Sequence, residues 1–207
     1  MNSNCKVIGI IGEAGSGKTT YTNKMMETLD CLHIEGDKIG HEVLQIEEVM
    51  QSIIVHYGDA VISKNEVNGK NQINRQILGN IVFSNHIELE FLNKLTHPFI
   101  KEKIHQIITI NKKLYDYILI DGAALIEAYV IELCDKIIYC YAPKEVRLHR
   151  LIEGRGIDKA KADSIIESQY SSSYYGSFAD IIVDTTIEQS EVKMISYLRS
   201  LNEDIIE

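Results

Sequence analysis

Little in this sequence points to disorder, to a membrane or to secretion. Only two of its 207 residues are proline, and it contains neither an internal repeat nor a low-complexity segment. With 45% hydrophobic and 25% charged residues, its composition is that of one folded globular domain. No apolar run approaches bilayer-spanning length, and residues 1–5 lack the basic and apolar regions of a secretory leader. We therefore expect a cytoplasmic protein.

Cysteine and basic residues are also sparse. The four cysteines (Cys5, Cys31, Cys134 and Cys140) show neither C-x-x-C spacing nor histidine pairs set for zinc, so we expect reduced, mostly buried thiols. Lys and Arg total 21 against 30 Asp and Glu, which gives a formal net charge of −9. Neither nucleic acid nor an anionic membrane is therefore expected as a main partner. Basic residues that converge on one site can still bind an anionic small molecule.

The most informative stretch is a phosphate-binding loop near the N-terminus. Its residues are Gly12, Glu13, Ala14, Gly15, Ser16, Gly17, Lys18, Thr19 and Thr20. They match G-x-x-x-x-G-K-[ST] at every fixed position, between an apolar run at 7–11 that predicts a strand and a predicted helix at 19–29. Inward-facing N–H groups and the helix N-terminus of such a loop hold phosphate. We expect Lys18 to reach the β- and γ-phosphates of ATP and Thr19 to hold Mg²⁺. The alternative is a glycine-rich turn that only connects the strand to the helix, and such a turn would not need this combination of glycines, lysine and threonine.

Asp37 follows a second predicted strand at 31–34. In an open α/β sheet, residues just past the carboxyl end of a strand face the ligand crevice. A carboxylate there can accept the proton of a substrate hydroxyl or hold a metal-bound water. The alternative is an N-cap for the next helix, since Asp is a preferred cap. The nearby phosphate loop favours the catalytic interpretation.

The middle of the chain is predicted to be helical. Patterns predict helices at 42–57, 74–83, 89–95 and 98–110, with a short extended excursion and turn at 61–70 and a helix boundary at His97-Pro98. Such a region is where a protein of this type would carry an inserted acceptor-binding subdomain, about 42–114. Arg75 and His97 are its candidate polar contacts. The alternatives are a solvated helix face for Arg75 and a helix-end cap for His97.

The parallel sheet is predicted to resume after this region, so the core comprises about 1–41 and 115–207. Further strands are expected at 117–120, 135–141 and 180–184, and a final helix at 188–205. Asp121 stands at the end of the first of these strands. In many nucleotide-binding proteins a carboxylate at this position holds a water of the Mg²⁺ shell. The alternative is a carboxylate that caps the turn.

Three arginines, Arg147, Arg150 and Arg155, lie near the start of a predicted lid at about 150–175. Arginines on a closing lid neutralise the charge of a transferring phosphoryl group and exclude water. We assign the catalytic lid position to Arg155. The alternative for the group is ordinary surface pairing along a helix.

The order of these motifs resembles that of the dephospho-coenzyme A kinase family over nearly the whole chain. The matching pieces are residues 12–20, Glu35-Gly36-Asp37, Tyr57-Gly58, Asn68-Gly69, Arg75, Val82-Phe83, His97-Pro98, Asp121 to Glu127, Cys134-Asp135 and Gln169. The resemblance implies a three-layer α/β P-loop kinase fold and ATP-dependent phosphorylation of the ribose 3′-hydroxyl of dephospho-CoA, the last step of coenzyme A synthesis. It implies that Asp37 is the base or orienting carboxylate. It also implies that Lys18 and Thr19 act with Mg²⁺, and that His41, Arg75 and His97 contact the acceptor.

Some positions depart from the family pattern. Glu35-Gly36-Asp37 stands for Asp-Ala-Asp, and His41 replaces a frequent arginine. The lid arginine at Arg155 is displaced by one residue, and Ile165 stands where a second one is common. A lid with less positive charge leaves two alternatives open: a related nucleoside or nucleotide kinase, and an ATP-binding regulatory protein with little turnover. The sequence predicts no particular oligomeric state.

Overall fold

The computed structural model describes residues 5–64, 69 and 71–203. At its centre lies a five-stranded parallel sheet with strand order β2-β5-β1-β6-β7. Its strands are β1 (Lys6–Ile11), β2 (Cys31–Glu35), β5 (Tyr117–Asp121), β6 (Lys136–Tyr141) and β7 (Ile181–Asp184). All five predicted strands are confirmed within one residue of their expected bounds.

Helices connect and cover these strands. They are α1 (Lys18–Thr28), α2 (Gly36–Val43), α3 (Glu47–Tyr57), α4 (Arg75–Val82), α5 (His86–Asn111), α6 (Lys144–His149), α7 (Lys159–Glu167), α8 (Ser172–Gly176) and α9 (Ser190–Glu203). Short 3₁₀ turns lie at η1 (Asp59–Val61) and η2 (Val130–Leu133), and a π-helical turn at η3 (Arg150–Gly154). Among the described residues, no helix is both long enough and apolar enough to cross a bilayer.

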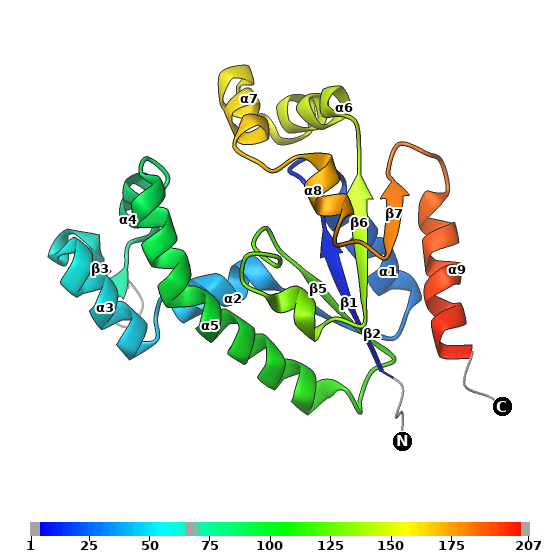
Figure 1. Cartoon of the computed structure of the whole chain (residues 1–207), viewed down its shortest axis with the longest axis horizontal. Helices are drawn as coiled ribbons and strands as arrows, with labels where there is room; N and C mark the ends of the chain where they lie inside the picture. Colours follow the sequence, from blue (N-terminus) through cyan, green and yellow to red (C-terminus); the bar gives the residue numbers. More distant parts are fainter. Residues whose placement is uncertain (1–4, 65–68, 70, 204–207) are drawn as a thin grey trace.

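The sheet is the middle of three layers, because alternate residues of each strand face opposite sides. On one face, Ile8 and Ile10 of β1 belong to a buried cluster that also contains side chains of α1 and α9. On the other face, Val7 and Ile11 join a larger cluster formed with α2 and α5. Figure 1 shows α9 beside β7, with α2 and α5 on the opposite side of the molecule.

The helices α3 and α4 stand away from the sheet, together with a small hairpin (Figure 1). Its two antiparallel strands are β3 (Ile62–Lys64) and β4 (Asn71–Ile73). This hairpin confirms the extended excursion predicted there. Of the predicted turn residues, Asn68 and Lys70 lie outside the described residues. The long helix α5 runs from this part of the molecule back to the sheet.

The single helix predicted at 42–57 is wrong, because the structure divides it. Helix α2 begins at Gly36, directly after β2, and ends at Val43, and α3 begins at Glu47 after an extended Ile46. The break lets each helix turn its own apolar residues inward: Ile39 and Val43 are buried in α2, and Val49 in α3. One straight helix would carry only one such stripe.

The helix boundary predicted at His97-Pro98 is also wrong. Helix α5 is continuous from His86 to Asn111, with Pro98 in its interior. Proline removes one backbone hydrogen bond, but Leu95 and Phe99 pack against the main core on either side of it. Thr96 is buried as well, and its hydroxyl donates to Leu92 O over 2.9 Å. Apolar packing across the proline therefore outweighs its local preference.

Candidate active site

The phosphate loop follows β1 and leads into α1, as predicted. Gly12, Gly15 and Gly17 have φ values of +149°, +78° and +96°, so the loop depends on backbone that favours glycine. The loop also packs closely on the neighbouring strand–helix connection. A Cβ at Gly12 would lie 2.5 Å from Cys140 O, and one at Gly15 only 2.7 Å from Arg147 O. The end of β6 and the start of α6 thus fix the position of the loop.

Lys18 lies along the inside of this loop. Its ammonium donates to Gly12 O, and also to Glu13 O over 3.2 Å. Burial lowers the pKa of Lys18, although nearby carboxylates such as Asp121 act in the opposite direction. The chain thus holds a cation against the carbonyl side of the loop.

A pocket of about 320 Å³ brings together most of the residues assigned to the donor side. It is lined by residues 12–20 of the loop together with Asp37, Asp121, Gly122, Ala123, Arg155 and Gln169. These residues come from the ends of β1, β2 and β5 and from the segment after α6. The carboxyl edge of the sheet is therefore where the chain gathers this polar set, as expected for an open α/β sheet.

Asp37 does not cap a helix, so that alternative is wrong. The N-cap of α2 is Glu35, and Asp37 lies within its first turn. Its Oδ1 accepts a hydrogen bond of 3.0 Å from the backbone N–H of Ala123, which follows β5. The segments that follow two adjacent strands, β2 and β5, thereby hold the carboxylate at the pocket.

Asp121 ends β5, opposite Glu35 of β2 and Ile10 of β1 in register. Its Oδ1 lies 3.1 Å from Nε2 of His33, a neighbour that no sequence pattern indicated. No group of three or more His, Cys, Asp or Glu side chains gathers as a metal site in the described part of the chain. Thr19 and Asp121 do both line the pocket, and they offer the oxygen donors that Mg²⁺ prefers.

The three arginines of the lid region have different surroundings. Arg155 lines the pocket. Arg150 instead donates to Gly15 O over 3.2 Å, and to Thr185 Oγ1 and Thr185 O over 2.9 and 3.1 Å. Arg147 is only 7% exposed and lies beneath the loop, beside Glu13. Surface pairing along a helix is therefore wrong for Arg147 and Arg150, which support the loop.

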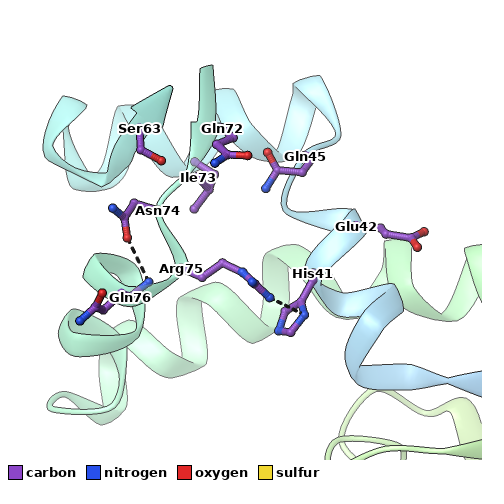
Figure 2. Close-up of a pocket in the computed structure, with 9 residues that line it drawn as sticks. All are labelled: His41, Glu42, Gln45, Ser63, Gln72, Ile73, Asn74, Arg75 and Gln76. Atoms are coloured by element: carbon purple, nitrogen blue, oxygen red, sulfur yellow. Dashed lines mark hydrogen bonds between the residues drawn. The ribbon is translucent and has the colours of Figure 1, made fainter. Parts of the chain in front are cut away.

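A second pocket, of about 570 Å³, lies between α2 and the β3–β4 hairpin (Figure 2). His41 and Arg75 point toward one another across it, and Nη1 of Arg75 donates to Nδ1 of His41 over 2.6 Å. This bond requires an unprotonated Nδ1. Burial and the Arg75 charge together lower the pKa of His41, which favours the neutral ring. Arg75 is exposed at the start of α4, so both its predicted contact with an acceptor and a solvated helix face remain open.

His97 lines neither of these two pockets. It is inside α5, so a helix-end cap is wrong, and its Nδ1 is 3.0 Å from Glu127 O. Burial lowers the pKa of His97. Its predicted contact with an acceptor stays a prediction.

Sequence patterns did not predict two contacts that support the loop. Thr185, just after β7, donates through Oγ1 to Ser16 O over 2.7 Å. Gln169 accepts a hydrogen bond of 2.9 Å from Ala14 N through Oε1. Both residues lie far from the loop along the chain, so local spacing gives no signal for these two contacts, although Gln169 is one of the residues that carry the family resemblance.

A phosphate loop between β1 and α1 of a parallel, helix-flanked sheet defines a P-loop nucleotide-binding protein, the class that includes the P-loop kinases. Solved structures share this fold: TT1252 from Thermus thermophilus superposes with a TM-score of 0.74 at 17% identity, covering 99% of this chain and 100% of that one. The dephospho-CoA kinase from Campylobacter jejuni gives a TM-score of 0.60 at 24% identity, covering 93% and 97%.

Sequence comparison identifies the family. The family model for dephospho-CoA kinase matches residues 6–191. The dephospho-CoA kinase of Dehalococcoides mccartyi is 32% identical over 189 residues, which cover 91% of this chain and 92% of the relative. The chain belongs to the dephospho-CoA kinase family, which confirms the resemblance seen in its motifs.

Proposed function

We propose that this protein transfers the γ-phosphoryl group of ATP to the ribose 3′-hydroxyl of dephospho-CoA, giving CoA and ADP in the final step of coenzyme A synthesis. The observation that carries the proposal is the 320 Å³ pocket, where the phosphate loop, Asp37, Asp121 and Arg155 meet. Membership of the family supports the choice of acceptor. The four cysteines are free thiols, in keeping with the cytoplasmic location that we also propose.

On the donor side, the loop fits the phosphates of ATP. Ser16 Oγ is buried and makes no hydrogen bond to any residue that the structure describes, so it can donate to a phosphate oxygen. Lys18 adds positive charge for the β- and γ-phosphates. Mg²⁺ would be held by the Thr19 hydroxyl, with Asp121 on one of its waters, and would neutralise developing charge on the phosphates.

Asp37 is proposed as the residue that accepts or orients the proton of the attacking hydroxyl. Its bond to Ala123 N fixes one carboxylate oxygen, so its direction in the pocket is set before substrate binds. Phosphoryl transfer needs mainly positioning and charge stabilisation. Arg155, which lines the same pocket, is proposed to stabilise the transferring group.

The acceptor is proposed to extend from Asp37 into the second pocket. Asp37 and His41 are four residues apart on α2, so both lie on the same side of that helix. Arg75 faces His41 across the pocket and offers a guanidinium to an anionic group of the acceptor. His97 is proposed to contact the acceptor from α5.

Turnover with a panel of acceptors tests this function. The purified chain with Mg-ATP should release ADP with dephospho-CoA at a rate well above that with nucleosides or nucleoside monophosphates. Turnover restricted to a nucleoside or nucleotide would contradict the proposed acceptor. Calorimetric ATP binding without turnover on any acceptor would instead favour a regulatory protein.

A further inference from the structure

Glu13, the second residue of the phosphate loop, is fully buried and carries an unusual set of contacts. Tyr139 donates to its carboxylate, with the hydroxyl 3.0 and 2.9 Å from the two oxygens. Ser172 donates to Oε1 over 2.8 Å. Arg147 Nη2 lies 3.8 Å from the same oxygen. None of these contacts is needed to bind phosphate through the loop backbone.

The cluster is built for a charged carboxylate. Burial raises the pKa of Tyr139 far above its ordinary value, so its hydroxyl stays protonated and donates. Arg147 has no other carboxylate within 4 Å in the described part of the chain, and its Nε and Nη1 make no hydrogen bond there. Two buried opposite charges thus compensate one another, and neither tolerates loss of its partner.

The partners of Glu13 come from three different elements. Tyr139 is on β6 and Arg147 on α6, and these elements already support the loop through its close packing at Gly12 and Gly15. Ser172, however, begins α8, at the far end of the predicted lid. Among the contacts that the Glu13 side chain makes with the described residues, the bond to Ser172 alone lies outside the supporting β6–α6 unit.

A second bond joins the loop to the same place. Ala14, next to Glu13, donates its backbone N–H to Gln169 Oε1 over 2.9 Å. Two successive loop residues are therefore tied to the segment 169–172 that leaves α7. The other end of this predicted lid carries Arg155, which lines the phosphate pocket.

We infer that Glu13 is a positioning residue that couples the phosphate loop to the lid through Ser172, so that the grip on nucleotide and the placement of Arg155 depend on each other. This inference deepens the proposed function and rests on it. A displacement of residues 169–172 withdraws the donor to Glu13 and the acceptor of Ala14 N–H together. The loop segment between Gly12 and Gly15 then loses its lid-side attachment while keeping its packing on β6 and α6.

The test is Ser172→Ala, with Ser173→Ala as the matched control on the same helix. Ser173 is exposed, and its hydroxyl contacts only Ser171 among the bonds described for it. Three quantities are measured: the thermal unfolding temperature, the Kd for Mg-ATP by calorimetry without acceptor, and kcat with KM for ATP.

We expect Ser172→Ala to weaken Mg-ATP binding about fivefold, the effect of one hydrogen bond of ordinary strength, and to lower kcat. Ser173→Ala should leave both unchanged at a similar unfolding temperature. Equal Kd and kcat values for the two variants would overturn the inference, since a merely structural contact changes only the unfolding temperature. A wild-type chain that binds ATP but does not phosphorylate dephospho-CoA would contradict the proposed acceptor alone, because the affinity comparison uses none.

Discussion

The carboxylate of Asp37 accepts a hydrogen bond of 3.0 Å from the backbone N–H of Ala123. The first residue follows β2 and the second follows β5, and these two strands are neighbours in the sheet. The bond joins the segments that follow β2 and β5 on one side of the pocket. It holds a charged side chain in place without the help of a helix cap.

Asp37→Asn should reduce kcat with dephospho-CoA by about 10²- to 10⁴-fold, the range associated with loss of a general acid or base. The amide oxygen can still accept from Ala123 N, so the fold and the Kd for Mg-ATP should change little. Single-turnover kinetics and calorimetry measure the two quantities. Unchanged turnover would leave Asp37 with the structural bond alone.

Arg155→Ala should lower kcat by a larger factor than it raises KM for ATP, because a charge that acts on the transferring group contributes most in the transition state. Arg199→Ala is the control, since Arg199 lies on α9 and bonds Thr28 O instead. Arg150→Ala should behave differently and lower thermal stability, because Arg150 makes three hydrogen bonds to Gly15 and Thr185. Steady-state kinetics that show no change for Arg155→Ala would exclude it from the lid role.

Arg75→Ala should raise the pKa of His41, because the substitution removes the nearby positive charge. In the wild-type chain, the lowered pKa of His41 makes the free energy of unfolding depend on pH in a definite direction. The contribution of His41 to the free energy of unfolding is present above the ordinary histidine pKa of about 6.5. It is lost as the pH falls from there through the pKa of His41 in the folded state. NMR titration of the His41 ring protons in both proteins measures the shift. An identical titration midpoint would show that Arg75 has no electrostatic effect on the ring.

Glu13→Gln should lower the free energy of unfolding by about 3 kcal/mol, since it leaves the buried Arg147 charge without compensation. Glu191→Gln is the control, because its ion pair with Lys24 lies at the surface, where solvent screens the two charges. Urea unfolding measures both. Removal of the second charge as well, in Glu13→Gln with Arg147→Met, should restore part of the loss. Equal effects of the two single variants would contradict a buried charge pair.

Local patterns predicted the strands and the phosphate loop well, because each depends on residues that are adjacent in sequence. The loop needs glycine at its positive φ positions, and β1 needs only a short apolar run. Pro98 and Asp37 show where local preference fails. Packing on both sides of Pro98 keeps α5 continuous, and a contact 86 residues away determines what the Asp37 side chain does.

The arginines illustrate the same limit from the other direction. Arg147, Arg150 and Arg155 lie within nine positions of one another, and their spacing alone does not distinguish them. The contacts of Arg147 and Arg150 come from the phosphate loop and from Thr185 after the last strand. Only the assembled sheet brings these distant segments together and separates the two supporting arginines from the one that lines the pocket.

The bond between Thr185 and Ser16 spans 169 residues and links the last strand to the first loop. A chain emerging from the ribosome makes the loop early but receives this support only after β7 has been synthesised. The nascent protein therefore cannot complete its nucleotide grip until Thr185 has been translated. Premature termination before β7 would release a polypeptide with the loop sequence but without the anchor at Ser16.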